Sequence, residues 1–159
     1  MSAQAGAAVE LRWLTDDEQA VWRDFLDVVR VLMERLNRQM VEESGLTLAE
    51  YEVLVRLSEV QERRLRMSEL ADLVVNSRSR LTHTVHRLEE RGWVVREDCP
   101  NDRRGILCVL LPAGFAVLEA AAPGHIEAVR SLMFDVLEPD DVERLGVAMH
   151  KLRSGLRTA

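Results

Sequence analysis

Two short helical segments separated by a tight break constrain the fold of this chain more than any other feature of its sequence. Ser68 can cap the first helix, which extends over about 69–75, because its hydroxyl can accept a hydrogen bond from an unpaired N–H group of the first turn. Ser77 can cap the second helix, which runs to Arg91, and Gly92 then supplies the residue type that most readily ends a helix in the left-handed conformation. The pattern predicts a helix-turn-helix.

A β-hairpin is predicted directly after the second helix. Residues 93–97 have the composition of a strand, and residues 106–111 form a second apolar run. Between them, residues 98–105 contain Pro, Asn, Asp and Gly, the residue types that favour turns. A helix-turn-helix followed by a hairpin predicts a winged helix-turn-helix.

Two capping boxes open helices on the N-terminal side of this unit. Thr15-Asp-Asp-Glu18 is the first, and apolar residues then recur every three or four positions as far as Gly45, which indicates one long helix. Thr47-Leu-Ala-Glu50 is the second, and it opens a shorter helix.

Helical spacing resumes on the C-terminal side. Pro112 begins a fifth helix. Pro123 and Gly124 should kink or break this helix near Ala122, because proline lacks the N–H group that the helix requires. Pro139 fits the first position of a last helix.

The predicted fold class is mainly α with a small β-hairpin wing. We expect a flexible N-terminal arm over 1–14, a winged helix-turn-helix module over 46–111, and a helical dimerisation region formed by 15–45 and 112–159. The first, fifth and sixth helices carry apolar stripes that a small wing module cannot cover, whereas pairing across a two-fold axis can cover them. A helical bundle within one chain is the alternative.

The distribution of charge favours an anionic partner for the middle of the chain. The net charge is −6, but residues 56–104 hold eleven Arg against nine Asp plus Glu, and the remainder holds ten basic against eighteen acidic residues. A mildly cationic segment in an acidic frame fits a protein that touches phosphate with one part only. The sequence has no Gly-rich phosphate loop, nucleophile elbow or paired His-Glu zinc motif, so we expect neither an enzyme nor a cofactor.

The second helix of the helix-turn-helix carries one polar face. At 100° per residue, Leu81, Val85 and Leu88 fall together on the core side. No acid precedes Glu89, although an ordinary surface helix carries acids in its first turn. The polar face could therefore donate to guanine or phosphate in a major groove, and a merely solvated face is the alternative. This face carries Ser79, Arg80, His83, His86, Arg87 and Glu90.

Two arginines lie at the expected tip of the hairpin. A narrow minor groove concentrates negative potential, which would attract Arg103 and Arg104. Asp102 is expected to hold Arg96 or Arg104 in a fixed orientation through a bidentate pair. A polar turn that contacts nothing is the alternative.

The cysteines and histidines indicate no metal or export. Cys99 and Cys108 flank the expected turn and could face each other as a redox pair, but free thiols in a reducing cytoplasm are the simpler interpretation. His83 and His86 lack a third and a fourth ligand, so no metal site is predicted. No secretion signal or membrane span is recognisable, and we expect a cytoplasmic protein without a membrane partner.

The segment from Arg66 to about Gly114 resembles the DNA-binding core of the MarR family of bacterial regulators. The helices on either side agree with that family in number and order. The resemblance implies a dimer with interlocked terminal helices, a recognition helix in the major groove and a wing in the minor groove. It also implies a response to small phenolic or other aromatic ligands, or to cysteine oxidation. The motifs that carry it are Leu70-Ala71, Ser77 with Ser79, the Arg-Leu-Glu-x-x-Gly motif that ends at Gly92, and Arg96 with Asp102-Arg103-Arg104.

By this resemblance the DNA contacts lie on the helix-turn-helix and on the wing. Leu111 departs from the family, because it replaces a hydroxyl residue that often caps the fifth helix and so predicts a weaker cap. The predicted DNA-binding residues are Ser68, Ser77, Arg78, Ser79, Arg80, Thr82, His83, Arg87, Arg103 and Arg104, with Arg96 and Asp102 orienting the wing.

The sequence therefore predicts a regulator of transcription that binds specific double-stranded DNA as a homodimer. We expect a ligand-responsive repressor, with a small aromatic effector, acting on a pseudo-palindromic operator whose half-sites lie about one DNA turn apart. One alternative is a winged-helix module that binds protein. Another is a small-molecule-binding protein or an enzyme, housed in the helical region, that does not bind DNA.

Overall fold

The computed structural model describes residues 11–74, 78–99 and 102–158, and the side chains of these residues except those of 102–104 and 157–158. The helices are α1 (Asp16–Ser44), α2 (Leu48–Ser58), α3 (Met67–Leu73), α4 (Arg78–Glu90), α5 (Pro112–Val129) and α6 (Pro139–Thr158), and the strands are β1 (Arg64–Arg66), β2 (Val94–Cys99) and β3 (Asp102–Leu110). A 3₁₀ turn (Gln61–Arg63) precedes β1, and a π-helical turn (Arg130–Phe134) follows α5.

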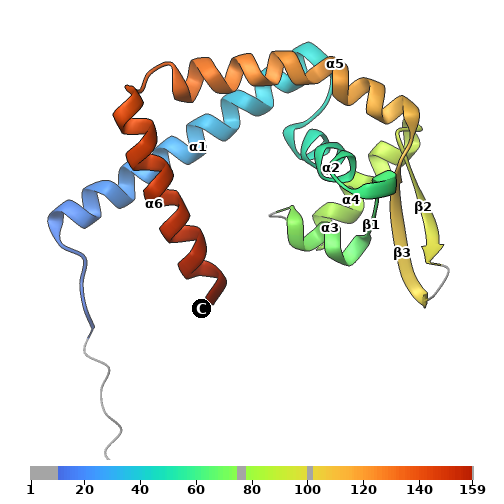
Figure 1. Ribbon diagram of the computed structural model, residues 1–159, viewed down its shortest axis with the longest axis horizontal. Helices are drawn as coiled ribbons and strands as arrows, with labels where there is room; N and C mark the ends of the chain where they lie inside the picture. Colours follow the sequence, from blue (N-terminus) through green and yellow to red (C-terminus); the bar gives the residue numbers. More distant parts are fainter. Residues whose placement is uncertain (1–10, 75–77, 100–101, 159) are drawn as a thin grey trace, which may run out of the picture.

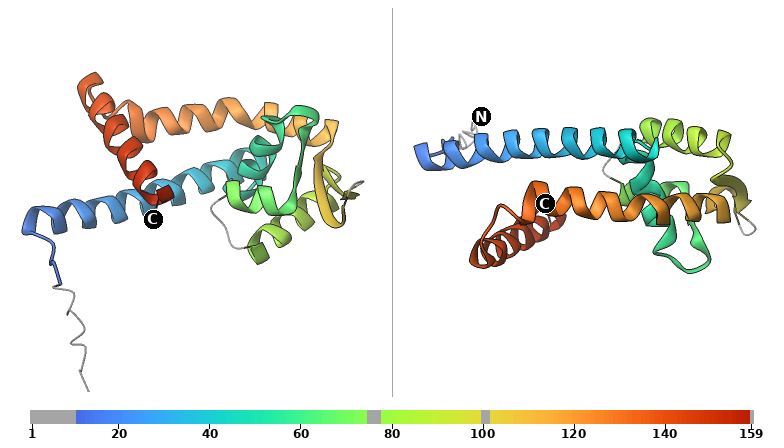
Figure 2. Two further views of the ribbon diagram at one scale, coloured as in Figure 1. Left: turned by 60° about the horizontal axis from the view of Figure 1, so that its bottom comes forward. Right: turned by 90° about the horizontal axis from the view of Figure 1, so that it is seen from above.

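These elements form a lobe and a pair of long helices that extend from it. The lobe contains α2, α3, α4 and the sheet, whereas α1 and α5 run side by side away from it (Figures 1 and 2). At the remote end of α5 the chain turns into α6, which crosses the direction of α5 (Figure 1). The arrangement has the predicted fold class, mainly α with a small wing sheet.

Capping interactions fix the ends of α1 and α2 where the sequence predicts them. The hydroxyl of Thr15 accepts the N–H of Glu18 at 3.2 Å, and the Glu18 carboxylate accepts the N–H of Thr15 at 2.8 Å. Thr47 and Glu50 form the second capping box. Gly45 ends α1 in the left-handed conformation at φ 68°, where a side chain would be strained. Both capping-box predictions are confirmed.

The helix-turn-helix is formed by α3 and α4. The helix α3 begins at Met67 with Arg66 at the N-cap, so Ser68 is the second residue of the helix and the predicted cap is wrong. The carboxylate of Glu69 instead accepts the N–H of Arg66 at 3.1 Å. Gly92 terminates α4 as predicted, at φ 69°, and the N–H of the following Trp93 donates to a carbonyl in the last turn.

The sheet is three-stranded and antiparallel, in the order β1-β3-β2. The predicted hairpin exists, but its strands are longer than predicted: Asp98 and Cys99 belong to β2, and residues 102–105 belong to β3. The predicted bounds of the turn, 98–105, are therefore wrong. Asp98 pairs with Ile106 and Cys99 pairs with Asp102, so the register shifts between these pairs and β3 holds additional residues there. This irregularity lets residue types that favour turns belong to the strands.

The two cysteines do not face each other across the hairpin. Cys108 lies opposite Arg96, and Cys99 lies opposite Asp102, so three residues, or about 10 Å of strand, separate the two positions. A disulfide requires Cα atoms less than about 7 Å apart. Both thiols are free, and burial raises the pKa of Cys108 to about 12.

The core lies inside the lobe. It contains Leu81, Val85 and Leu88 of α4, which confirms the predicted inward face of that helix. Of the long helix α1, only Leu36 and Met40 are buried. The rest of the core comes from α2, α3, α5 and the sheet, including Tyr51, Val53, Leu54, Leu57, Leu70, Val94, Cys108, Leu110, Leu118 and Ala121.

The helix α5 continues through Pro123 as far as Val129, so the predicted break near Ala122 is wrong. Close packing against α1 holds this part of the helix: a Cβ atom on Gly124 would lie 2.3 Å from a carboxylate oxygen of Glu43. Tertiary packing thus outweighs the loss of one helical hydrogen bond. Leu111, at the N-cap of α5, makes no side-chain capping bond, as the sequence predicts.

The terminal helices leave much apolar surface exposed. On α1, 52% of the surface of Trp22 and 61% of that of Val28 is exposed, and on α6 the value for Leu156 is 80%. An apolar groove lies between α1 and the turn into α6, and its walls include Val31, Leu132 and Val136. A single chain therefore does not bury the stripes that the sequence predicts on these helices.

Candidate functional site

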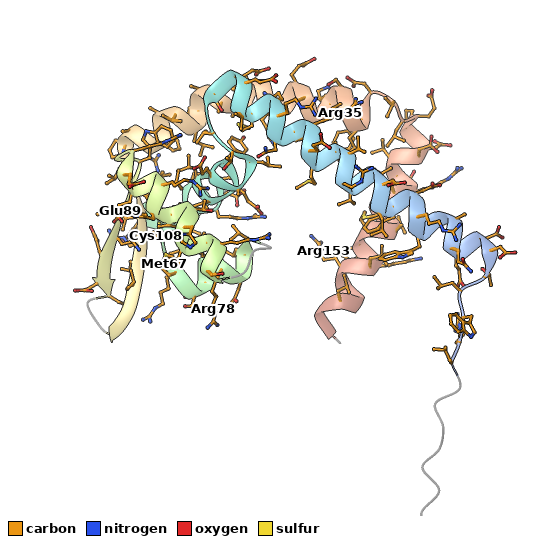
Figure 3. All side chains as sticks on the ribbon, turned by 180° about the vertical axis from the view of Figure 1, so that it is seen from behind. Arg35, Met67, Arg78, Glu89, Cys108 and Arg153 are labelled. Carbon is orange, nitrogen blue, oxygen red and sulfur yellow. The ribbon has the colours of Figure 1, made fainter. Side chains whose placement is uncertain are left out.

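The face of α4 that points away from the core is exposed along most of its length. Its first turn has no acidic residue, so neither an acidic side chain nor the helix dipole opposes an approaching anion there. Figure 3 shows Arg78 at the outer edge of the lobe, pointing away from the core. The exposed residues of this face are Arg78, Ser79, Arg80, Thr82, His83, His86, Arg87 and, at its end, Glu90.

Local hydrogen bonds set what this face can donate and accept. The hydroxyl of Thr82 donates to the carbonyl of Arg78 at 2.9 Å, which leaves its oxygen available as an acceptor. His86 lies 3.6 Å from a carboxylate oxygen of Glu90, so the end of this face is less cationic than its start. The cationic character of α4 is thus concentrated in its first turns.

Arg87 joins α4 to the first turn of α2. The Nε–H of Arg87 donates to Oε1 of Glu50 at 2.9 Å. Only 2% of the surface of Glu50 is exposed. Burial raises the pKa of Glu50, but the hydrogen bonds from Thr47 and Arg87 outweigh burial, so its pKa lies below the ordinary value. The carboxylate is therefore charged at neutral pH and holds the guanidinium in place.

Arg96 joins the wing to the end of α4. Its Nε and Nη2 donate to one oxygen of Glu89, at 2.9 and 2.5 Å, and its backbone N–H donates to the other at 3.0 Å. The side-chain hydrogen bonds from Arg96 lower the pKa of Glu89. The sequence predicts Asp102 as the partner that orients an arginine here; the structure gives Arg96 a different partner. Glu89 lies beside Cys108, where α4 packs on the sheet (Figure 3).

The remaining predicted contacts are placed less fully. Ser68 is exposed as the second residue of α3. Ser77 lies outside the described residues, and so do the side chains of Asp102, Arg103 and Arg104, although their backbone belongs to β3. The structure therefore brings Ser68 and the residues of α4 into one lobe with the wing strands, and it leaves the wing-tip contacts as predictions.

Sequence reasoning missed the role of Glu50 and Glu89. Glu50 was interpreted only as a capping residue, yet it precedes the buried Leu54 and Leu57 at spacings of four and seven, which places it on the buried face of α2. A carboxylate on a buried face requires a cationic partner. That spacing was the signal, although it could not identify Arg87 as the partner.

Neither a metal centre nor a membrane segment is found in the described part of the chain. Among residues 11–74, 78–99 and 102–158, no three His, Cys, Asp or Glu side chains are grouped so that they could hold a metal ion. In the same ranges, no helix combines the length and the apolar run that a bilayer crossing requires.

Comparison with known proteins gives a consistent result. Residues 46–106 match the MarR family. The chain is 46% identical to Sco3205 of Streptomyces coelicolor, a MarR family transcriptional regulator solved in complex with DNA, with a TM-score of 0.87 over 94% of this chain and 93% of that one. It is 41% identical to AbsC, a MarR family regulator of the same organism, with a TM-score of 0.85 over 94% of this chain and 100% of AbsC. The transcriptional repressor MprA of Escherichia coli is 27% identical over 125 residues, which span 79% of this chain and 70% of MprA.

Proposed function

The chain belongs to the MarR family of DNA-binding transcriptional regulators, and on this premise we propose that it is a homodimeric repressor that binds a pseudo-palindromic operator. In this proposal α4 is the recognition helix and enters the major groove, and the hairpin β2–β3 is the wing and reaches the minor groove. The predicted DNA-binding residues keep these roles as part of the proposal. So do the predicted regions: an arm over 1–14, a DNA-binding module over 46–111 and a dimerisation region over 15–45 and 112–159.

One observation carries the proposal: the exposed face of α4 begins with Arg78, Ser79 and Arg80 and has no acid in its first turn. Guanidinium and hydroxyl groups can donate to guanine O6 and N7, or to phosphate. A helix N-terminus adds free N–H groups for an anion. The solved complex of Sco3205 with DNA supports a DNA ligand for this face, since the two chains share their fold over nearly their whole length.

The exposed apolar surface of the terminal helices supports a homodimer. Soluble monomers rarely expose apolar patches larger than a few hundred Å², and α1 alone exposes Val21, Trp22 and Leu26 by about half or more of their surface. A two-fold axis through these helices would cover them and would place two recognition helices about one DNA turn apart, roughly 10–10.5 base pairs.

Regulation by a small aromatic effector completes the proposal. An effector bound between the DNA-binding module and the dimerisation region would change the spacing of the two recognition helices, and so the population of dimers that fit the operator. We propose that the protein acts in the cytoplasm, where its operator lies.

Selection of bound fragments from genomic DNA, followed by mobility-shift and footprinting assays, tests the function. We expect a two-fold-symmetric footprint, and an affinity that falls by roughly 10³–10⁵ between about 50 and 200 mM salt if six to ten phosphates are contacted. Arg104→Ala should weaken binding, whereas Arg130→Ala, in the turn after α5, should not. If both variants lose the same DNA affinity, the binding would reflect non-specific attraction to charge and not contacts made by the wing. Binding to a protein partner without any DNA shift would support the protein-binding alternative.

A further inference from the structure

Glu50 is a charged side chain enclosed in the core at the point where α2 meets the recognition helix. Its Oε2 accepts both the N–H of Thr47 at 2.8 Å and the Thr47 hydroxyl at 2.9 Å. Its Oε1 accepts the Nε–H of Arg87 at 2.9 Å. Both carboxylate oxygens are therefore occupied, and the position of the carboxylate is fixed by the helix start on one side and by α4 on the other.

Arg87 is held by one edge of its guanidinium only. A guanidinium has five N–H donors in a rigid planar fork, and the bond to Glu50 uses the one on Nε. Nearly half of the side-chain surface, 48%, is exposed. Within the described residues, its Nη1 and Nη2 make no hydrogen bond with another group. The terminal nitrogens of Arg87 thus remain available on the flank of the exposed α4 face.

Stability of the fold explains the capping bonds between Glu50 and Thr47, but it gives a poor reason for the pairing of Glu50 with Arg87. Glu50 lies on a face that otherwise packs with Leu54 and Leu57. Replacing a buried ion pair with well-packed apolar residues is often neutral or stabilising in proteins. A negative charge close to a surface that binds phosphate also repels the ligand. The carboxylate fits better with a role that requires its geometry.

We propose that Glu50 is a positioning residue for DNA binding: it holds Arg87 by Nε so that the two terminal nitrogens of the guanidinium point at one DNA phosphate beside the major groove. The inference rests on the proposed function, and it assigns a task to a residue of α2 that itself touches no DNA. Bidentate contacts between arginine and phosphate depend on the orientation of the fork, which an unrestrained arginine must adopt at the cost of side-chain entropy.

The proposal predicts that Glu50→Gln weakens DNA binding, whereas the loss of a negative charge alone would strengthen it. Glu50→Gln removes a negative charge near the DNA, which by Coulomb attraction alone should tighten binding. Loss of the orientation of Arg87 should instead weaken binding by about tenfold, and should lower the magnitude of the salt slope by about 0.9, the value of one phosphate contact. Glu52→Gln removes the same charge from the same helix and is the matched control, with binding unchanged or slightly tighter.

The experiment measures affinity and salt slope on a DNA fragment that the unaltered protein binds, together with thermal unfolding of each variant. Four variants are compared with the unaltered chain: E50Q, R87A, E50Q/R87A and E52Q. The proposal holds if E50Q weakens binding while E52Q does not, and if E50Q has no further effect in the R87A background. It is overturned if E50Q binds as well as the unaltered protein, or if the losses from E50Q and R87A add.

A variant on the other partner covers the case in which E50Q does not fold. Arg87→Lys can keep the ion pair with Glu50, but a single ammonium cannot hold the carboxylate and a phosphate with separate edges of a fork. We expect R87K to lose as much affinity as R87A while it unfolds near the temperature of the unaltered protein. Binding by R87K at the unaltered level would refute the positioning role. If the unaltered protein binds no DNA, the proposed function fails first and this inference falls with it.

Discussion

Replacing Glu89 by glutamine tests the ion pair that fixes β2 of the wing to α4. Glu89 accepts with both oxygens, one from the backbone N–H of Arg96 and one from its guanidinium. Glutamine has a single acceptor oxygen, so it loses the negative charge and leaves one of these donor groups facing an NH2 group. Hydrogen bonds to charged groups contribute about 1.5–3 kcal/mol and neutral ones about 0.5–1.5 kcal/mol. Because 28% of Glu89 and 31% of Arg96 are exposed, solvent screens part of the difference. We expect a loss of about 1.5 kcal/mol in the free energy of unfolding.

The pH dependence of this loss has a definite sign. The pKa of Glu89 in the folded protein lies below its ordinary value of 4.5, so its stabilising effect is complete above that value and disappears as the pH falls through the folded pKa. The difference in stability between the unaltered chain and E89Q should be full at neutral pH and should narrow as the pH falls below 4.5.

Thermal and denaturant unfolding at one fixed protein concentration measure this difference. A loss of about 1.5 kcal/mol corresponds to a fall in Tm of about 3–6 °C for a chain of this size. The control is Glu34→Gln, which removes a similar pair with Arg38 on the surface of α1, where 58% of Glu34 and 62% of Arg38 are exposed; it should change stability by less than about 0.5 kcal/mol. If E89Q and E34Q unfold alike, or if the E89Q difference is independent of pH, the reasoning is refuted.

Three further outcomes are expected from the fold. Leu26→Asp, on the exposed stripe of α1, should give monomers in sedimentation experiments; a stable dimer would place the interface elsewhere. Gly114→Ala should cost about 1–3 kcal/mol, because its Cβ would lie 2.3 Å from the backbone carbonyl oxygen of Trp93. Gly124→Ala, whose Cβ meets only the flexible ends of the Glu43 and Gln39 side chains, should cost less in the same denaturant titration, and equal losses would contradict this. The buried thiol of Cys108, whose pKa is raised to about 12, should resist alkylation at pH about 8 until the protein unfolds; mass spectrometry of the native protein that found Cys108 labelled would disprove it.

Features set by neighbouring residues could be predicted from the sequence. The capping boxes at Thr15 and Thr47 and the terminating residues Gly45 and Gly92 involve groups at most a few positions apart, so the local pattern determines them. The inward face of α4 follows in the same way from helical periodicity alone.

Features set by residues far apart in the chain could not be predicted from the sequence. Pro123 predicts a kink or a break in α5, but the helix continues through it to Val129, where Gly124 lies close to Glu43 of α1. The Arg87–Glu50 pair joins residues 37 positions apart, and no local rule selects that partner. The length of the wing strands depends on a register shift opposite Asp98, which residue types near the turn do not reveal.

The unbroken course of α5 has a mechanical consequence. Its 18 residues make a rod of about 27 Å that starts at the base of the wing and ends beside the turn into α6. Tilting such a rod by about 5° displaces one end by about 2 Å. In a two-fold dimer the displacement would occur in both chains. The separation of the two DNA-binding modules would then change by about 4–5 Å, more than the 3.4 Å rise of one base pair. A tilt of a few degrees in α5 would therefore be enough to place the two copies of α4 out of register with an operator.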